Sequence, residues 1–307
     1  MNPINSPRFI PHGLVPTREQ ARIQLAQDKV VLIEANAGAA KTTTLALRIG
    51  EALARKLAPE SILALTFTPK ACEVMRIRLR DVGIAEALAA RVAIMTFDEY
   101  AGRVLAQGEG SDAIACYRDD RDLKPYALAA IDNAGAHYGG QYDFLDLQTH
   151  NLALSRFLDV QLELKATMAL GNDQDQDQDH EAAAAAFNVP LSDYLTTLEY
   201  ERIRLGSHED ALFRGPFDAT YDLARSLNDS GSSMPGGAPL SAYRLVLCDE
   251  LHDLNEAAFC ILNALLAAPD CYFLGAGDKD QVIHAKLGAS DQYLQRRFAS
   301  SYPKLAR

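Results

Sequence analysis

The chain has 307 residues, 48% of them hydrophobic, which is enough for two domains and a sizeable buried core. Its five scattered cysteines lack the spacing of a zinc site or a disulfide framework, which indicates a reducing, cytoplasmic compartment, and no apolar run reaches the roughly 18 residues of a membrane span. The net charge of −11 excludes a surface that is basic all over, as in simple nucleic-acid binders, but leaves room for a local basic groove.

Short apolar runs alternate with amphipathic stretches between residues 30 and 105, a rhythm typical of βαβ units on a parallel sheet. The runs that predict strands are "VVLIEA" (30–35), "SILALTFT" (61–68) and "RVAIMTF" (91–97). The stretches 42–57 and 69–83 predict helices, and Pro69 suits the first turn of the second one. This part of the chain therefore predicts an α/β fold with a parallel sheet.

The pattern changes at about residue 109 to mostly helical, tyrosine-bearing segments without clear strands, which indicates an inserted domain. Inside it, the Asp/Gln tract of "NDQDQDQDHEAAAAAF" (172–187) has little to bury and predicts a solvated loop, while the alanines that follow favour a helix. The stretch "NDSGSSMPGGAP" (228–239) is rich in Gly, Ser and Pro and predicts a linker.

The strand pattern resumes after this linker. "YRLVLCDE" (243–250) and "CYFLGAGD" (271–278) predict strands with a helix between them at 255–268, and the last residues, 291–307, predict a helix and a tail. We expect both strands to join the first sheet. The α/β domain then comprises residues 1–108 and 236–307, and the mainly helical insertion comprises residues 109–235.

The loop after the first strand, "EANAGAAKTTTLAL" (34–47), is similar to the phosphate-binding pattern G-x-x-x-x-G-K-[ST]. In that pattern backbone N–H groups surround the phosphates, the lysine reaches the outer phosphates and the hydroxyl binds Mg²⁺. Alanine replaces both glycines, at Ala35 and Ala40, and the Cβ of Ala40 crowds the loop if this position needs a positive φ. We interpret the loop as a repaired or weakened nucleotide site. Its candidate nucleotide contacts are Ala37, Gly38, Ala39, Ala40, Lys41, Thr42 and Thr43.

Two acids end the strand in "LVLCDELHD" (245–253). Ligands of open α/β sheets bind at the carboxyl ends of the strands, so Asp249 joins Thr42 as a candidate Mg²⁺ ligand. Glu250 is a candidate to orient or deprotonate the attacking water. The alternative is that both acids only favour the start of a following helix. The next strand ends in the turn "GDKDQ" (277–281), whose candidate functional residue is Gln281.

Taken in order, the lysine loop, the acid pair and this turn resemble the UvrD/Rep-like superfamily 1 DNA helicases, and the resemblance extends through six blocks between residues 13 and 289. It implies a first RecA-like domain, interrupted by a helical insertion, that binds ATP and Mg²⁺. The block "PTREQARIQ" (16–24) is similar to the family's adenine-reading motif, which implies that Gln20 pairs with the adenine edge. The catalytic residues implied by the resemblance are Lys41, Asp249, Glu250 and Gln281.

Two further blocks imply the path of single-stranded DNA. They are "ALTFTPKACEVMRIRL" (64–79) and "IMTFDEYAGRVL" (94–105), and the implied contacts are Thr66, Phe67, Lys70, Thr96 and Phe97. Both phenylalanines could instead be core aromatics. The sequence departs from the family pattern at three places: Asp98 replaces a histidine, His252 a glutamine, and Lys286-Leu287 an aromatic–arginine pair.

The resemblance implies the amino-terminal motor half of an ATP-dependent DNA helicase or translocase, which hydrolyses ATP with Mg²⁺ and contacts single-stranded DNA or a single-stranded tail. Nothing after residue 289 resembles the second RecA-like domain, which would act in cis or in trans, so we expect little or no unwinding by this chain alone. The alternative is a non-catalytic module that holds nucleotide, DNA or a protein partner, the last at the insertion. Lys41 and the acid pair favour the enzyme, whereas Ala40 favours the alternative.

Overall fold

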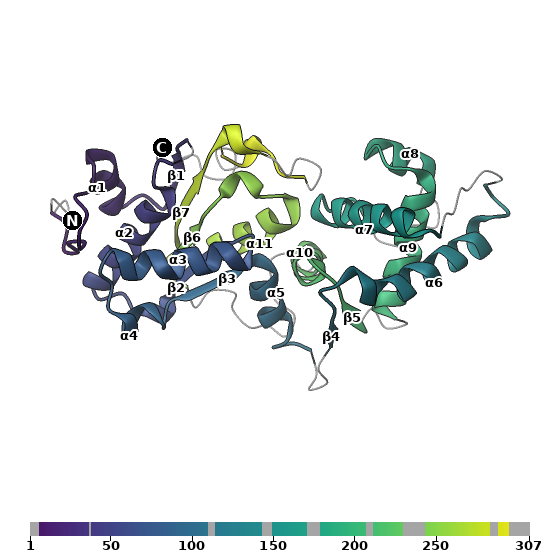
Figure 1. Ribbon diagram of the computed structural model, residues 1–307, viewed down its shortest axis with the longest axis horizontal. Coiled ribbons are helices and arrows are strands. Elements are labelled where there is room, and N and C mark those ends of the chain that lie inside the picture. The colour runs from purple at the N-terminus through teal and green to yellow at the C-terminus, as the bar shows by residue number, and fades with distance from the viewer. Residues whose placement is uncertain are drawn as a thin grey trace.

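The computed structural model describes residues 6–36, 38–109, 114–142, 149–170, 179–206, 211–229, 243–282 and 288–294. Its centre is a sheet of five parallel strands in the order β1-β7-β6-β2-β3 (Figure 1). The strands are β1 (Val30–Glu34), β2 (Ile62–Thr66), β3 (Ala93–Thr96), β6 (Leu245–Cys248) and β7 (Tyr272–Gly277). The two strands that follow the insertion lie between β1 and β2, which confirms the expected α/β fold with a parallel sheet.

Helices cover both faces of this sheet, because alternate residues of a strand point to opposite faces. In β1, Val30 and Leu32 belong to one apolar core and Val31 to the other. One face packs against α2 (Lys41–Ala54) and α3 (Pro69–Asp81), and the other against α5 (Phe97–Leu105), α10 (Asp218–Asp229) and α11 (Glu256–Leu266). The remaining helices around the sheet are α1 (Arg18–Gln24), α4 (Glu86–Ala89) and the 3-10 helices η1 (Pro59–Ser61), η3 (Leu251–Asp253), η4 (Lys279–Gln281) and η6 (Asp291–Leu294).

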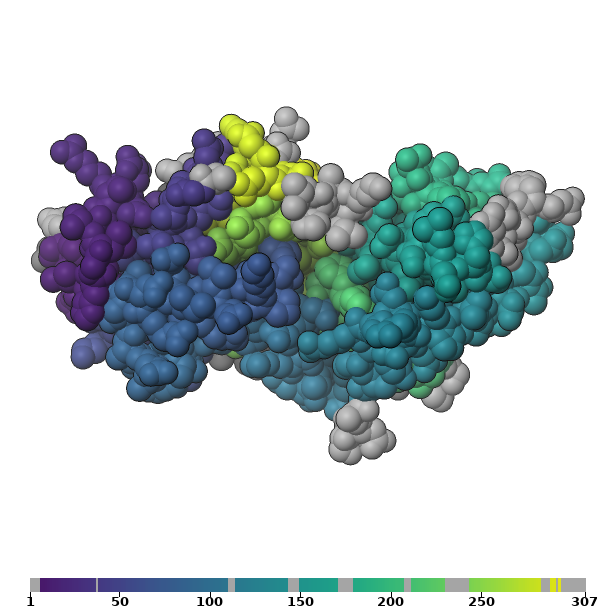
Figure 2. All heavy atoms as spheres, viewed as in Figure 1, coloured from purple at the N-terminus to yellow at the C-terminus, as the bar shows by residue number. Residues whose placement is uncertain are grey.

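Four helices form a second lobe beside the sheet, seen in teal and green in Figures 1 and 2. They are α6 (Asp120–Tyr138), α7 (Asn151–Ala166), α8 (His180–Ala186) and α9 (Leu191–Leu205), and they pack around apolar clusters of their own. Helix α8 confirms the helix expected after the Asp/Gln tract, whereas the tract itself lies outside the described residues. None of the helices in the described ranges is long and apolar enough to span a bilayer.

Sequence patterns missed one small sheet in this part of the chain. The strands β4 (Ala115–Cys116) and β5 (Phe213–Arg214) pair in parallel. Ala115 is paired with Phe213, and 97 residues of the chain lie between these two. Two residues are too short to show the alternation by which a strand is recognised. Of the expected helix and tail at the end of the chain, the structure describes a 3-10 turn, η6, and residues 295–307 lie outside the described ranges.

Helix α10 connects the two lobes. Its sequence lies inside the expected insertion, yet Ala219, Leu223 and Leu227 belong to the apolar core on one face of the central sheet. The helix ends at Asp229, so the first two residues of the expected linker are helical, and residues 230–242 are not described. The boundaries 109–235 for the insertion stay a proposal, but the packing groups α10 with the sheet.

A buried cluster of ion pairs lies where the helical lobe meets α10. Arg204 on α9 is fully buried, and its guanidinium donates to Glu201 at 2.6 Å and to Asp222 on α10 at 2.7 Å. Burial opposes the charge of Arg204, but the carboxylates around it outweigh burial and raise its pKa. The buried Lys165 of α7 bonds to Glu201 and to Asp218. We call these residues, together with Arg214 and Glu109, the ion cluster.

We predict that Arg204→Met lowers the free energy of unfolding by about 3 to 5 kcal/mol, because it leaves buried carboxylates without a counter-charge. Urea unfolding at neutral pH measures the effect. The matched control is Arg121→Gln: Arg121 pairs with Asp119 on the surface, where an ion pair contributes roughly 0 to 1 kcal/mol. Equal stability losses in the two variants would contradict the prediction.

Candidate functional site

The lysine loop joins β1 to the N-terminus of α2 at the carboxyl edge of the sheet. The Ala35 N–H donates to the Gly277 carbonyl at 3.0 Å, which extends the β1–β7 pairing into the loop, and the Ala39 N–H closes a turn onto the Asn36 carbonyl at 3.1 Å. Gly38 has a φ of 78° and open space beside it. The candidate contact Ala37 lies outside the described residues. The loop therefore directs the first turn of a 14-residue helix at the place expected for phosphates.

Ala40 is the N-cap of α2 and adopts the left-handed conformation, with φ 56° and ψ 40°. Few residues other than glycine adopt this conformation, because the Cβ of an L-residue approaches the following carbonyl oxygen. Position 40 therefore has the positive φ at which the Cβ of alanine was expected to crowd the loop. Alanine is accommodated here as a strained residue, since the carbonyl of Ala40 still accepts from the Thr44 N–H at 3.0 Å and starts the helix.

Lys41 and Thr42 are the first two residues of α2. The Lys41 side chain is 8% exposed and its ammonium donates to the Ala35 carbonyl at 3.4 Å, so it bends back over the loop. The Thr42 hydroxyl donates to the Asp249 carboxylate at 2.6 Å across 207 residues of sequence. Thr43 is buried on the same turn. The structure therefore brings the loop and the first acid of the pair into direct contact.

The contact between Thr42 and Asp249 fits a Mg²⁺ site. Hydroxyl and carboxylate oxygens are ligands that Mg²⁺ prefers, and nucleotide-bound Mg²⁺ takes most of its other ligands from phosphate and water. No group of three or more His, Cys, Asp or Glu side chains with metal-site geometry occurs in the described part of the chain. One hydroxyl and one carboxylate suit a metal that takes its other ligands from a nucleotide and water.

Both acids of the pair lie in surroundings that disfavour their charge. Burial raises the pKa of Asp249, against the hydrogen bond from Thr42. Burial and the charge of Asp249 raise the pKa of Glu250. Glu250 has a φ of 54°, and its Oε2 atom is buried and receives no hydrogen bond from the residues that the structure describes. Asn255 caps α11, whereas Glu250 is the N-cap of η3 without a side-chain capping bond, so the alternative role of the acids at a helix start stays a prediction.

His252 links the acid pair to the turn after β7. It is 4% exposed, and its Nδ1 accepts from the Asp278 N–H at 3.1 Å and lies 3.6 Å from the Glu250 carboxylate. Burial lowers the pKa of His252, so the ring is neutral and its proton is on Nε2 when Nδ1 accepts. Gln281 is half-buried in η4, where its N–H donates to the Asp278 carbonyl at 3.0 Å. No pattern in the sequence predicts this role of His252.

A cavity of about 520 Å³ lies next to the loop, between α1, β1 and the start of α2. Gln20 lines it and is 8% exposed. Its side-chain oxygen accepts from the Thr17 N–H at 3.0 Å and its amide donates to the Thr44 hydroxyl at 3.4 Å. The amide that was expected to pair with an adenine edge is therefore engaged in capping α1, and pairing with a base requires it to exchange these partners. Its adenine contact stays a proposal.

The five expected DNA contacts lie at the ends of β2 and β3, but they differ in exposure. Thr66 and Thr96 are buried; the Thr66 hydroxyl bonds to the Thr68 carbonyl, and Thr96 forms a capping box with Glu99 at the start of α5. Lys70 is exposed on the first turn of α3. These three residues carry no direct sign of a nucleic-acid contact.

The two phenylalanines of this edge have different roles. Phe97 is 3% exposed and belongs to the apolar core, which favours the alternative of a core aromatic, and its stacking on DNA stays a prediction. Phe67 is half-buried and its ring centroid lies 5.1 Å from that of Phe97, with 34° between the planes. The Phe97 ring thus packs against the Phe67 ring, and Phe67 remains the candidate for stacking on a base.

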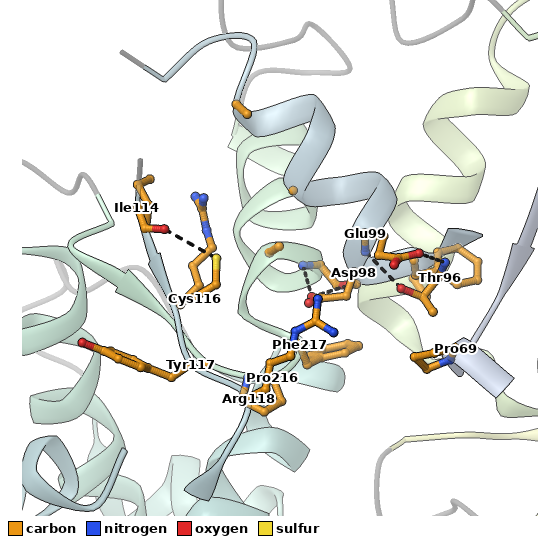
Figure 3. Close-up of a pocket in the computed structure, with 18 of the residues that line it drawn as sticks. Pro69, Thr96, Asp98, Glu99, Ile114, Cys116, Tyr117, Arg118, Pro216 and Phe217 are labelled. Carbon is orange, nitrogen blue, oxygen red and sulfur yellow. Dashed lines mark hydrogen bonds between the residues drawn. The ribbon is translucent and has the colours of Figure 1, made fainter. Parts of the chain in front are cut away.

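Asp98, which stands where the family has a histidine, has a structural role. It is half-buried in the contact between α5 and α10, and its carboxylate accepts from the N–H and the hydroxyl of Thr220, both at 3.1 Å (Figure 3). Burial raises the pKa of Asp98, against these two hydrogen bonds. This departure therefore exchanges a side chain of the DNA-binding block for an anchor of α10.

A family model described as "UvrD/REP helicase N-terminal domain" matches residues 16–301. No curated protein was found to match the chain. The matched range includes the loop, the acid pair, the turn after β7 and the whole helical lobe.

We predict that Ala40→Gly increases the free energy of unfolding. It removes a left-handed strain of about 1 to 2 kcal/mol, and the added backbone entropy of glycine offsets about 0.5 to 1 kcal/mol of this. Urea unfolding without nucleotide should show a net gain of roughly 0.5 to 1 kcal/mol, and ATP affinity at fixed Mg²⁺ should rise in parallel. The control is Ala39→Gly at a residue without positive φ, which should give no gain. Weaker ATP binding by Ala40→Gly would show that alanine is the adapted residue.

A second prediction concerns pH. Because burial raises the folded-state pKa of Asp249, the stability associated with its protonated form is lost as the pH rises through that pKa. Asp249→Asn has no such loss. The free energy of unfolding of the variant should therefore increase relative to the unchanged protein as the pH rises from about 4 toward 7 in the absence of Mg²⁺. Parallel pH profiles of the two proteins would refute the assignment.

Proposed function

The chain belongs to the UvrD/REP helicase N-terminal domain family, and on that basis we propose that it is the ATP-dependent motor half of such a DNA helicase or translocase. The observation that carries this proposal is the 2.6 Å hydrogen bond between Thr42 and Asp249, formed beside Lys41 at the N-terminus of α2. In a fold without a nucleotide site, no function would require a hydroxyl, a carboxylate and an ammonium to lie together at this point.

Each residue of the loop has a role in this proposal. The backbone N–H groups of the loop and the first turn of α2 face the phosphates, where the helix dipole favours negative charge. Lys41 exchanges the Ala35 carbonyl for an outer phosphate oxygen, and this exchange neutralises charge next to a buried acid. Mg²⁺ held by Thr42 and Asp249 would supply charge neutralisation on the terminal phosphates.

Glu250 and Gln281 are proposed to handle the attacking water. Glu250 lies at the carboxyl end of β6 with one oxygen that has no donor, and its raised pKa makes it a better proton acceptor at neutral pH than an exposed carboxylate. Gln281 follows the next strand of the sheet, and His252 connects the two elements through the Asp278 N–H. A shift of the acid pair on nucleotide binding would thus reach the turn that carries Gln281.

Single-stranded DNA is the proposed substrate of the edge formed by β2 and β3, with Phe67 as the stacking residue and Lys70 as a phosphate contact. We further propose that unwinding needs a second RecA-like domain, in cis or in trans, and that the protein acts in the cytoplasm. The alternative of a non-catalytic module draws its support from the strained Ala40. The intact set of Lys41, Thr42 and Asp249 favours the enzyme.

The test is ATP binding by calorimetry with and without Mg²⁺. Lys41→Ala should abolish binding, because the phosphates lose their only contact with a cation of the loop. Lys70→Ala removes the same charge from an exposed helix start and should bind ATP like the unchanged protein. Equal ATP affinity in the Lys41 variant, or binding that is unaffected by Mg²⁺, would exclude the proposed site.

A further inference from the structure

Residues 6–12 lie against α2 and α3, at the purple end of the molecule in Figure 1, and we call them the strap. Phe9 packs on Gly50 of α2 so closely that a Cβ at position 50 would lie 2.5 Å from the Phe9 ring. The His12 N–H donates to the carbonyl of Val82, which follows α3, at 3.0 Å. The strap is therefore packed on the fold by specific contacts.

A buried carboxylate on α2, that of Glu51, holds the strap. It accepts from the N–H groups of Arg8 and Phe9, each at 2.9 Å, and from the Arg55 guanidinium at 2.6 Å. Burial opposes the charge of Glu51, but the hydrogen bonds from Phe9, Arg8 and the Gln24 amide outweigh burial and lower its pKa. Glu51 is thus a charged acceptor inside the fold, and its donors come from different segments of the chain.

The same carboxylate reaches α1 through Gln24, the last residue of that helix. Gln24 is 1% exposed, and its amide donates to Glu51 at 3.2 Å and to the Phe9 carbonyl at 2.8 Å. The Gln24 carbonyl accepts from the Arg48 guanidinium of α2 at 3.3 Å. The end of α1 is therefore bonded to both the strap and α2.

Helix α1 forms one wall of the 520 Å³ cavity beside the lysine loop, with Glu19, Gln20 and Ile23 among its lining residues. The phosphate contacts proposed above, Lys41 and Thr42, lie on α2 about three turns before Glu51. Because α2 carries both these contacts and Glu51, the bonds of Glu51 set the position of the cavity wall relative to the phosphate site. The strap residues are not among those that line the cavity.

We propose that Glu51 is a positioning residue for the base of the nucleotide: with Gln24 and the strap it fixes α1 at the distance from the phosphate site that a nucleoside triphosphate spans. The inference rests on the proposed function, because it requires ATP in the lysine loop. A wall that must be ordered at the moment of binding costs affinity, and a wall that is already fixed avoids this cost. Glu51 acts on the nucleotide through Gln24 and α1.

The test compares two ligands by calorimetry on the full chain with Mg²⁺: ATP, and inorganic tripolyphosphate, which has the phosphates but no base or sugar. Glu51→Gln replaces one acceptor oxygen by an NH₂ group that faces N–H donors, so the strap and Gln24 lose partners. Affinity for ATP should fall by about 2- to 12-fold, the cost of ordering one side chain on binding. Affinity for tripolyphosphate should stay unchanged.

The matched control is Glu60→Gln. It makes the same chemical change in an exposed carboxylate, which pairs with Arg91 at 2.5 Å on the surface. Both affinities should stay as in the unchanged protein, because Glu60 contacts neither the strap nor α1 in the described structure.

Gly50→Ala moves the strap without touching the carboxylate, because the new Cβ displaces the Phe9 ring. Alanine favours a helix more than glycine does, so α2 itself is not weakened. This variant should show the same selective loss of ATP affinity. Thermal unfolding of each variant shows whether it folds, and if Glu51→Gln does not fold, Gly50→Ala decides the outcome.

A loss for ATP without a loss for tripolyphosphate supports the inference. Equal losses for the two ligands, or no loss, would show that Glu51 stabilises the fold alone, and would overturn the inference while the proposed function stands. Equal affinity of the unchanged protein for ATP and tripolyphosphate would overturn it as well, because the base would then contribute nothing. If the unchanged protein does not bind ATP, the proposed function fails and the inference fails with it.

Discussion

The hydrogen bond between Thr42 and Asp249 requires a particular arrangement of the strands and of the helical lobe. It joins the start of α2 to the end of β6 across 207 residues, so β1 and β6 must end at the same edge of one sheet. Parallel pairing achieves this, with β7 inserted between the two strands. The helical lobe can occupy the sequence between β3 and β6 only because it leaves and returns on the same side, through α5 and α10, which pack against each other.

The nucleotide edge of the sheet concentrates unfavourable local conformations and charges. Ala40 and Glu250 both have left-handed backbones, with φ of 56° and 54°. They flank the contact between Thr42 and Asp249, Ala40 just before α2 and Glu250 just after β6. Two neighbouring acids at the end of β6 have raised pKa values because they are partly removed from water. Such strain persists where the surroundings determine the conformation, and here the buried β6 and β7 strands do so. Stability is thus lowered at the place where phosphate and metal would restore it.

Different interactions stabilise the central sheet and its junction with the helical lobe. The sheet and its helices rely on two apolar cores, whereas the junction with the helical lobe relies on buried ion pairs that need exact counter-charges. The orientation of α9 and α7 relative to α10 is fixed by ion pairs from Arg204 and Lys165 to the acids of α10. Asp98 adds a further bond from α5 to α10. The departure from the family's histidine therefore strengthens the junction between the two lobes.

The sequence determined the local elements and the location of the candidate nucleotide site. Apolar runs and amphipathic periods predicted all five strands of the sheet and the helices α2, α3 and α11, because burial on one or two faces leaves a period in the chain. Packing alone decided that Phe97 is a buried core residue while Phe67 stays half-buried, because both have the same local pattern and differ only in what covers them. The left-handed Ala40, the β4–β5 pair and the ion cluster were likewise decided by tertiary structure. Their partners lie far apart in sequence, and a buried charge is stable only where the fold brings its counter-charge within reach.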